Sequence, residues 1–244
     1  MHVLVTRPEP DSIKLVGLLQ KRGHTAQAAP LSAFVPLGID ADVLEGVTGL
    51  IATSRNALRA IVGSDALVAA RGLTVFAVGA ATAEEARRMG FAKVVKGPGT
   101  ATELGPLVAS LVDPAEDLLL HLTGERTAHD LAGELGLLGV RAASHVVYRM
   151  DAAKALPKQA VETIRGGHLG AVVLMSPDAA TIWTRLIVAH GLTEAARDVS
   201  HLCLSETVAR RIARLAPLTI RQARRPTLEE MLALVDLAAA NRGD

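Results

Sequence analysis

Short apolar segments alternate with longer segments of helical period along almost the whole chain, and this alternation constrains the fold more than any other feature. Ten of the apolar segments are strand candidates, six with a clear pattern and four with a weaker one; the weaker four are 24–30, 93–95, 142–148 and 218–221. Strands that alternate with helices form parallel sheets covered by crossover helices. The sequence therefore predicts an α/β fold. The six clear strands, each followed by an Ala-, Leu- and Arg-rich stretch, are 3–6, 49–53, 74–78, 117–122, 171–175 and 200–204.

The two halves of the chain resemble each other in the same order, which indicates an internal duplication. Three pairs of segments share a pattern: 2–31 with 118–148, 49–61 with 171–183, and 76–90 with 202–216. Repeated order and spacing are typical of duplicated structural units, although weak self-similarity within any α/β chain is the alternative. The duplication predicts two similar lobes. It leaves open whether each half folds as one lobe or the halves exchange elements.

Small polar residues follow each of the six strands, and such residues cap helices by accepting hydrogen bonds from the first amides. Pro8 and Pro177 suit the first helical positions, which need no amide donor. The carboxyl ends of parallel strands share one edge, where helix-start amides attract anions and where ligands bind. If two lobes face each other there, we expect one cleft to receive several turns and to bind a polyanion, whereas a cap without a ligand is the alternative for each turn. The turns are Thr6-Arg7-Pro8, Thr53-Ser54-Arg55-Asn56, Gly79-Ala80-Ala81-Thr82, Thr123-Gly124-Glu125-Arg126, Ser176-Pro177-Asp178 and Ser205-Glu206-Thr207.

Four side chains near these turns carry more specific chemistry. Arg7, Arg55 and Arg126 can bind carboxylates through two parallel hydrogen bonds, or can simply be solvated. Tyr148 ends a predicted strand beside one of two non-periodic connections, 30–36 and 150–157, that suit domain boundaries. A phenol at the mouth of a cleft can donate a proton, and ordinary packing with a bonded hydroxyl is the alternative.

Composition excludes several classes of function. The formal net charge is +1, so no overall field attracts nucleic acid or an anionic membrane. Three Phe, one Tyr and one Trp offer too few rings to stack on single-stranded bases. The lone Cys203 excludes an internal disulfide and a cysteine-rich metal site. We therefore expect no nucleic-acid partner and no metal.

The N-terminal sequence and the hydropathy pattern bear on location. Met1 leads directly into an apolar strand pattern without the basic segment of an export signal, and no run reaches the ~18 apolar residues of a membrane span. We expect a cytoplasmic protein without a membrane partner, and a monomer.

Common motifs for cofactors and nucleophiles are absent from the sequence. GxGxxG, GxxxxGK, HExxH and GxSxG do not occur, which argues against a dinucleotide site, a phosphate loop, a zinc protease and a hydrolase elbow. His121 and His129 lack the pattern of a metal site and are interpreted as core or surface histidines. The Arg-rich stretch 209–225 is interpreted as a solvated face, although part of it could extend an anion site.

An ordered set of segments over almost the full length resembles the uroporphyrinogen-III synthase family. Each segment is a loose match by itself, and their order is what carries the resemblance. The segments are VLVTRPEPDSIKLVGLLQKRGH, GLIATSRNALRAI, FAVGAATAEEARRMGF, VVYRM, VVLMSPDAATIW and RRPTLEEMLALV.

The resemblance implies two flavodoxin-like lobes with parallel sheets, joined by a two-stranded linker. It further implies that the first strand-helix unit is exchanged and packs into the lobe formed by the last third of the chain. On this interpretation one domain is residues 1–34 plus 152–244, and the other is residues 35–151.

The resemblance also implies a cofactor-free lyase that cyclises hydroxymethylbilane, a linear tetrapyrrole octacarboxylate, with loss of water and inversion of the terminal pyrrole ring through a spiro intermediate. By resemblance, Tyr148 is the proton donor and Thr82 a second catalytic group, while Thr6, Thr53, Ser176 and the other turn residues bind carboxylates. Relatives often carry Gly-Pro-Thr-Thr where this chain has Ser205-Glu206-Thr207-Val208. We carry over Thr207 and not Val208, and expect Glu206 either to point away from substrate or to weaken that turn.

Two other classes of function use the same turns. A cytoplasmic two-lobed sensor would bind an anionic small molecule and be stabilised by it without turnover. A nucleotide-using α/β enzyme is disfavoured by the missing phosphate-loop glycines. Separation of the product isomers formed from hydroxymethylbilane discriminates the synthase from both.

Overall fold

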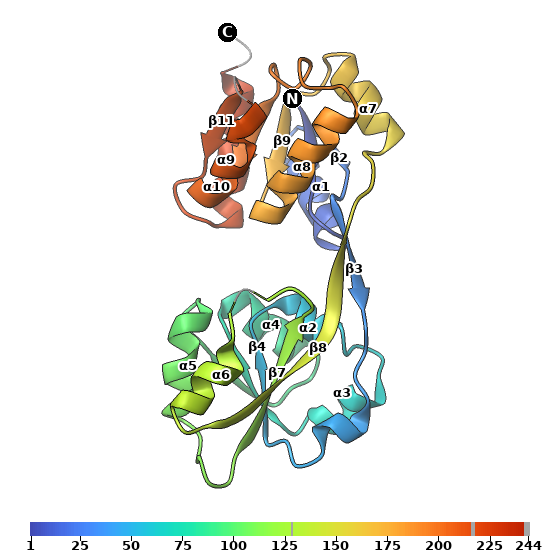
Figure 1. Cartoon of the computed structure of the whole chain (residues 1–244). Helices are drawn as coiled ribbons and strands as arrows, with labels where there is room; N and C mark the ends of the chain where they lie inside the picture. The colour runs from blue at the N-terminus through green and yellow to red at the C-terminus, as the bar shows by residue number, and fades with distance from the viewer. Residues whose placement is uncertain (128, 216–217, 242–244) are drawn as a thin grey trace. The chain divides into compact units, whose positions relative to one another are not determined.

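The computed structural model describes residues 1–127, 129–215 and 218–241, which form two compact units (Figure 1). Unit 1 contains Met1–Ala33 and Asp151–Asp244, and unit 2 contains Phe34–Met150. The chain therefore passes from one unit to the other twice.

Unit 1 is built on a five-stranded parallel sheet in the order β11-β10-β9-β1-β2. The strands are β1 (His2–Val5), β2 (Thr25–Ala28), β9 (Ala171–Leu174), β10 (Ser200–Cys203) and β11 (Thr219–Gln222). The helices are α1 (Asp11–Lys21), α7 (Lys158–Arg165), α8 (Pro177–Ala189), α9 (Glu206–Ile212) and α10 (Leu228–Ala240), with a short 3-10 turn η2 (Ala213–Leu215).

Alternate strand residues of unit 1 pack against helices on opposite faces of the sheet. Leu4 and Val172 contact the cluster formed with α7, α8 and α9, whose largest member is the fully buried Trp183. Val3 and Val173 point the other way, into the cluster formed with α1 and α10. Strands that are buried on both faces have continuous runs of apolar residues in the sequence. This explains why the sequence pattern predicted these strands clearly.

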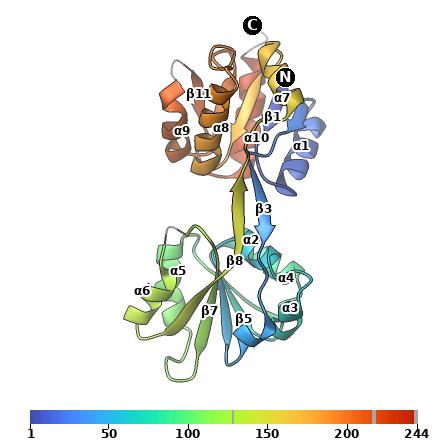
Figure 2. The same ribbon diagram turned by 45° about the vertical axis from the view of Figure 1, so that its right-hand side comes forward.

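Unit 2 holds a six-stranded sheet in the order β3-β8-β7-β4-β5-β6. Its strands are β3 (Ser32–Pro36), β4 (Gly49–Ala52), β5 (Thr74–Ala77), β6 (Lys93–Lys96), β7 (Leu118–Gly124) and β8 (Arg141–Ala152). Its helices are α2 (Arg55–Arg59), α3 (Asp65–Ala70), α4 (Ala80–Arg88), α5 (Ala101–Ala109) and α6 (Leu131–Leu137), with η1 (Ala41–Leu44). Leu50 and Leu120 face α2, α3 and α4, whereas Ile51 and Leu119 face α5 and α6, the pair on the other side of the sheet in Figure 2.

Strands β3 and β8 form the two-stranded connection between the units. The Leu37 N–H donates to Val147 O at 2.8 Å, and the Ala153 N–H donates to Leu31 O at 2.9 Å, so the two strands run antiparallel. The sequence pattern predicted a non-periodic connection at 30–36; the chain does pass between the units there, but residues 32–36 form strand β3 instead of an irregular segment. The strand is short and ends in Pro36, so its signal is weak.

The sheet orders confirm the predicted duplication and exchange. Both β2-β1-β9-β10-β11 and β8-β7-β4-β5-β6 follow the flavodoxin-like order. Strands β1 and β2 belong to the first sequence repeat but complete the sheet of β9, β10 and β11, while β7 and β8 of the second repeat complete the sheet of β4, β5 and β6. The predicted α/β class with parallel-sheet lobes is confirmed.

Candidate functional site

Each sheet has one position where the direction of the strand order reverses, and ligands of open α/β sheets bind beside that position. In unit 1 it lies between β1 and β9, whose following helices α1 and α8 cover opposite faces. In unit 2 it lies between β7 and β4, followed by α6 and α2. Thr6 and Ser176 follow the first pair of strands, and Gly124 and Thr53 lie at the ends of the second. The sequence-predicted turns therefore lie at both reversal points.

Tyr148 lies against the end of β7. Its register partner is Gly124, after a bulge between Thr123 and Gly124, and its carbonyl accepts a hydrogen bond from the Glu125 N–H at 2.9 Å. A Cβ at Gly124 would be 2.7 Å from Tyr148 Cζ and 3.0 Å from the phenol oxygen. The ring of Phe34 also packs against the phenol, with ring centroids 5.7 Å apart. The glycine thus allows the half-buried phenol to lie directly on the backbone at the carboxyl end of β7.

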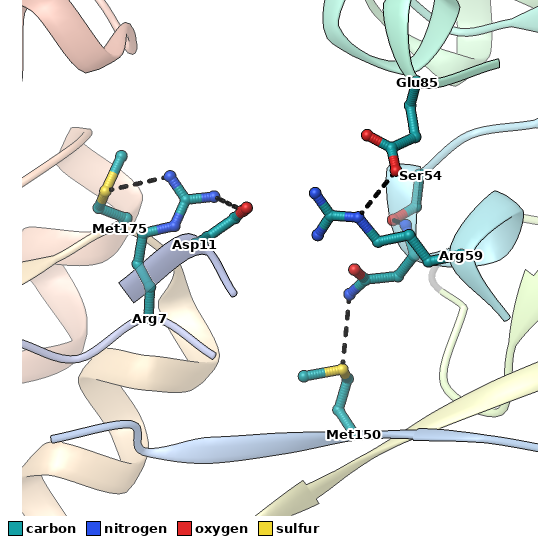
Figure 3. Close-up of polar contacts among 8 residues, drawn as sticks. Arg7, Asp11, Ser54, Arg59, Glu85, Met150 and Met175 are labelled. Carbon is teal, nitrogen blue, oxygen red and sulfur yellow. Dashed lines mark hydrogen bonds and ion pairs between the residues drawn. The ribbon is translucent and has the colours of Figure 1, made fainter. Parts of the chain in front are cut away.

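The turn after β4 combines a helix cap with a buried histidine. Ser54 Oγ accepts a hydrogen bond from the Asn56 N–H at 3.1 Å and so caps α2, as expected. Thr53 Oγ1 lies 3.1 Å from Nε2 of His121, which is 1% exposed on β7. Asn56 donates its side-chain amide to Met150 Sδ at 3.6 Å, next to the turn shown in Figure 3. Arg55 is half-buried and has a polar partner of its own.

The turn after β5 leads into α4. Gly79 precedes the helix, Ala81 is exposed and Thr82 is buried in the first turn. The Arg59 Nε donates to Glu85 Oε1 at 3.2 Å, which ties α2 to α4 (Figure 3).

Glu85 is a buried carboxylate that this ion pair compensates. Burial alone raises the pKa of the Glu85 carboxyl, but hydrogen bonds from Arg88 and Arg59 outweigh burial and lower the pKa. A charged and bonded Glu85 fixes the spacing of the two helices, and therefore of the Ser54 and Gly79 turns that precede them.

In unit 1 the turn after β1 is anchored by its own side chains. Thr6 is buried, and its Oγ1 donates to Val173 O at 2.6 Å. Arg7 forms an ion pair with Asp11 at 2.5 Å and donates to Met175 Sδ at 3.6 Å (Figure 3). The prediction that Pro8 occupies an early helical position was wrong, because α1 begins at Asp11; the Pro8 carbonyl accepts a hydrogen bond from the Ser12 N–H.

The turns after β9 and β10 differ in their caps. Ser176 Oγ accepts from the Ala179 N–H at 3.1 Å, and Pro177 is the first residue of α8, as predicted. Ser205 precedes α9 but forms no side-chain cap, and Thr207 is exposed. Glu206 is held by Arg210 of the same helix at 2.5 Å, so its charge is compensated.

The turn 123–126 departs from the prediction. Gly124 still belongs to β7, and α6 begins only at Leu131, where Asp130 accepts from the Gly133 N–H at 3.1 Å. The predicted helix start at this turn was therefore wrong, because the bulge carries the strand onward instead. Thr123 is buried and Arg126 is exposed.

His121 is the functional candidate that sequence reasoning interpreted only as structural. Burial, with a smaller effect of the His129 charge, lowers the pKa of His121 to about 4. A signal was present in the sequence, because a histidine within LLLHL on a strand buried on both faces must find a partner or remain unsatisfied. In the part of the chain that the structure describes, no cluster of three or more His, Cys, Asp and Glu is placed to hold a metal ion. Nor does any helix among these residues have the length and hydropathy to cross a membrane.

Comparison with known proteins agrees with the geometry. A family model described as uroporphyrinogen-III synthase HemD matches residues 13–233. The chain belongs to the uroporphyrinogen-III synthase family. Members of this family are cyclising lyases of tetrapyrrole synthesis, so the expected role in heme biosynthesis is confirmed and the sensor is not favoured.

Solved structures of the family share the fold. The uroporphyrinogen-III synthetase from Helicobacter pylori 26695 is 16% identical, with a TM-score of 0.68 over 97% of this chain and 98% of that chain. A mutant uroporphyrinogen III synthase from the extremely thermophilic bacterium Thermus thermophilus is 18% identical, with a TM-score of 0.54 over 99% of each chain. A search of curated proteins finds no match.

Proposed function

We propose that this family member converts hydroxymethylbilane, a linear tetrapyrrole octacarboxylate, to uroporphyrinogen III, and that Tyr148 is the proton donor. The observation that carries the role of Tyr148 is its position: the phenol lies on Gly124 at the end of β7, beside the reversal point between β7 and β4. That edge is where folds of this class bind ligands.

The first step is departure of the terminal hydroxyl. A proton from the Tyr148 phenol goes to this hydroxyl, the carbon–oxygen bond breaks, and water departs. This leaves the substrate as an electrophilic azafulvene in its N-protonated, cationic form and Tyr148 as a phenolate, which recovers its proton when the closing macrocycle releases one. General acid catalysis of this kind contributes about 10²- to 10⁴-fold. No nucleophile from the protein is required, which agrees with the absence of the common nucleophile motifs in the sequence.

The second step is a problem of geometry. The free substrate can close to the uninverted isomer, so the enzyme must present the substituted carbon of the terminal ring to the azafulvene and form the spiro intermediate. We propose that the turn residues hold the substrate carboxylates for this purpose, because orientation of reacting groups lowers the barrier substantially. The caps at Ser54 and Ser176 leave further helix-start amides of α2 and α8 for such contacts.

The binding roles differ among the predicted residues. The Thr6 hydroxyl donates to Val173 O and Arg7 is paired with Asp11, so we assign both to shaping the turn after β1. Arg126 is exposed and fits direct contact with a carboxylate. Pairing with Arg210 reduces the expected repulsion by Glu206, so the Ser205 and Thr207 turn stays in the proposed site.

We further propose that the units correspond to two domains, 1–34 with 152–244 and 35–151, and that the enzyme works as a cytoplasmic monomer. The single cysteine of the sequence, Cys203, is free and buried, and a chain without disulfides fits the reducing cytoplasm. Burial raises the pKa of the Cys203 thiol to about 12. Sedimentation at micromolar concentration tests the monomer, and a dimer would contradict it.

Incubation with hydroxymethylbilane, followed by separation of the product isomers, tests the reaction. We expect the type III isomer at a rate far above spontaneous closure. Formation of the type I isomer alone, at the spontaneous rate, would refute the proposed function. Stabilisation by the substrate without turnover would instead favour the sensor.

A further inference from the structure

His121 and Thr53 form a polar pair across the reversal point of unit 2. His121 lies on β7 opposite Ile51 of β4, and Thr53 follows β4 two residues after Ile51. His121 Nε2 is 3.1 Å from Thr53 Oγ1. The imidazole is 1% exposed, and its Nδ1 has no partner within the described residues. A buried, half-satisfied imidazole is costly and calls for an explanation.

The duplicated fold shows that this polar pair is not needed for packing. In unit 1, Val5 lies opposite Val173 of β9, as His121 lies opposite Ile51. Met175 follows Val173 by two residues, as Thr53 follows Ile51. Val5 and Met175 both pack in the apolar cluster with α1 and α10. The equivalent positions of the sheet in unit 1 therefore accept apolar side chains.

The hydrogen bond has two possible directions, and they differ in what they leave unpaired. If Thr53 donates to Nε2, the proton of the neutral ring lies on Nδ1, and an N–H donor is buried without an acceptor. If Nε2–H donates to Thr53, only a lone pair of Nδ1 stays unpaired. The second arrangement avoids burying an unpaired donor and leaves the hydroxyl hydrogen of Thr53 free to point elsewhere.

We propose that His121 is a positioning residue: its Nε2–H fixes Thr53 so that the threonine hydroxyl donates to a carboxylate of the substrate. Thr53 is half-buried at the carboxyl end of β4, immediately before the cap residue Ser54. The inference rests on the proposed function, because it assumes an octacarboxylate ligand at this edge.

The surroundings keep the ring neutral. Burial has the largest effect on the pKa of His121, His129 lowers it further, and Asp130, which precedes α6, acts in the opposite direction. Ile51 and Leu119, the neighbours on the same face, are apolar. A neutral ring has one donor, so the choice of tautomer decides the direction in which Thr53 can donate.

Kinetics of four variants test the assignment. His121→Leu and Thr53→Val should each raise the KM for hydroxymethylbilane roughly tenfold, the range of a hydrogen bond to a charged group, with kcat little changed. The double variant should be no worse than either single variant, and His121→Gln, which keeps an N–H donor, should recover much of the affinity. His201→Gln is the matched control, because His201 is also buried but lies in β10 of unit 1; it should lower stability without changing KM.

Nitrogen-15 NMR of histidine-labelled protein reads the tautomer without turnover. The signal that His121→Leu removes should show the proton on Nε2. A proton on Nδ1, a wild-type KM in His121→Leu, or additive losses in the double variant would each overturn the inference. If the wild-type protein makes no type III isomer, the proposed function fails instead, and the NMR result still reports the direction of the hydrogen bond.

Discussion

Gly124→Ala probes the support of the proposed proton donor by adding one methyl group. The new Cβ would lie 2.7 Å from Tyr148 Cζ and 3.0 Å from both Cε2 and the phenol oxygen. Carbon atoms in contact sit at about 3.5 Å, so the ring must move by roughly 0.8 Å. The backbone of Tyr148 is held by β7 and by the Glu125 N–H, and Phe34 contacts the ring. The phenol therefore has to rotate away from the edge of the sheet.

Two magnitudes follow from this displacement. Overpacking of this kind typically costs about 1–3 kcal/mol of the free energy of unfolding. A misplacement of about 1 Å in a catalytic group costs up to about 10²-fold in rate. We expect kcat for hydroxymethylbilane to fall by about ten- to a hundredfold, and the type I isomer to become a larger share of the product because spontaneous closure then competes.

The assay combines isomer separation with urea denaturation, and two glycine variants separate steric from catalytic effects. Gly49→Ala places a Cβ 2.9 Å from Leu119 at the other end of the same sheet, so it should lower stability and leave the isomer ratio of folded enzyme unchanged. Gly136→Ala adds a methyl group in open space on α6, so it should leave the isomer ratio unchanged and raise the free energy of unfolding by up to about 1 kcal/mol, because alanine is the better helix former. A kcat for Gly124→Ala within twofold of wild type, in protein shown to be folded, would refute the reasoning.

Three further predictions concern the proton donor, the caps and the buried histidines. Tyr148→Phe should lower kcat by about 10²-fold with the fold intact, and Thr82→Ala should lower it less, both measured from initial rates. Ser176→Ala should cost about 1 kcal/mol of the free energy of unfolding, whereas Ser205→Ala should cost almost nothing because Ser205 makes no side-chain cap. Burial lowers the pKa of His201 to about 4, so the unfolded chain binds this proton first as the pH falls below the ordinary value of 6.5. The resulting stability should be complete above about pH 7.5 and should decrease by about 2 kcal/mol between about pH 7.5 and pH 5, and His201→Leu should remove that share.

Each of these expectations has a result that contradicts it. An unchanged rate in Tyr148→Phe would show that the hydroxyl is dispensable, and a larger loss in Thr82→Ala would reverse the proposed ranking. Equal losses in the free energy of unfolding for both serine variants would mean that the side-chain cap at Ser176 does not stabilise the protein. If the urea midpoint falls equally in wild type and His201→Leu as the pH is lowered, the pH dependence comes from other groups. His121 is one such group, because burial lowers its pKa in the same way.

The regular part of the fold was predictable because its physics is local. Continuous apolar runs mark strands buried on both faces, and the Ser54 and Ser176 caps mark the starts of helices. The apolar pattern did not predict strand β3, because the strand is short, half exposed and ends at Pro36. The exchange of β1 and β2 could not come from local pattern at all, since it depends on pairing between β1 and β9 far along the chain. The family resemblance supplied it.

The candidate site was predictable to the level of turns and not of side-chain roles. The predicted turn residues do lie at the carboxyl ends of the strands. Whether these residues bind substrate stays a prediction. Asp11, one helical turn beyond Arg7, was not considered as its partner, although such spacing favours an ion pair. The support of Tyr148 by Gly124 depends on a bulge between β7 and β8, which no residue spacing reveals.

The exchanged first segment has a consequence for synthesis on the ribosome. Strands β1 and β2 emerge well before β9, which begins at Ala171, so β1 must wait for its partner. At about 5–20 residues per second this delay is on the order of ten seconds, during which Phe34–Met150 is already complete and contiguous. The nascent chain therefore completes Phe34–Met150 before the sheet that contains β1, and β1 spends that interval with one unpaired edge.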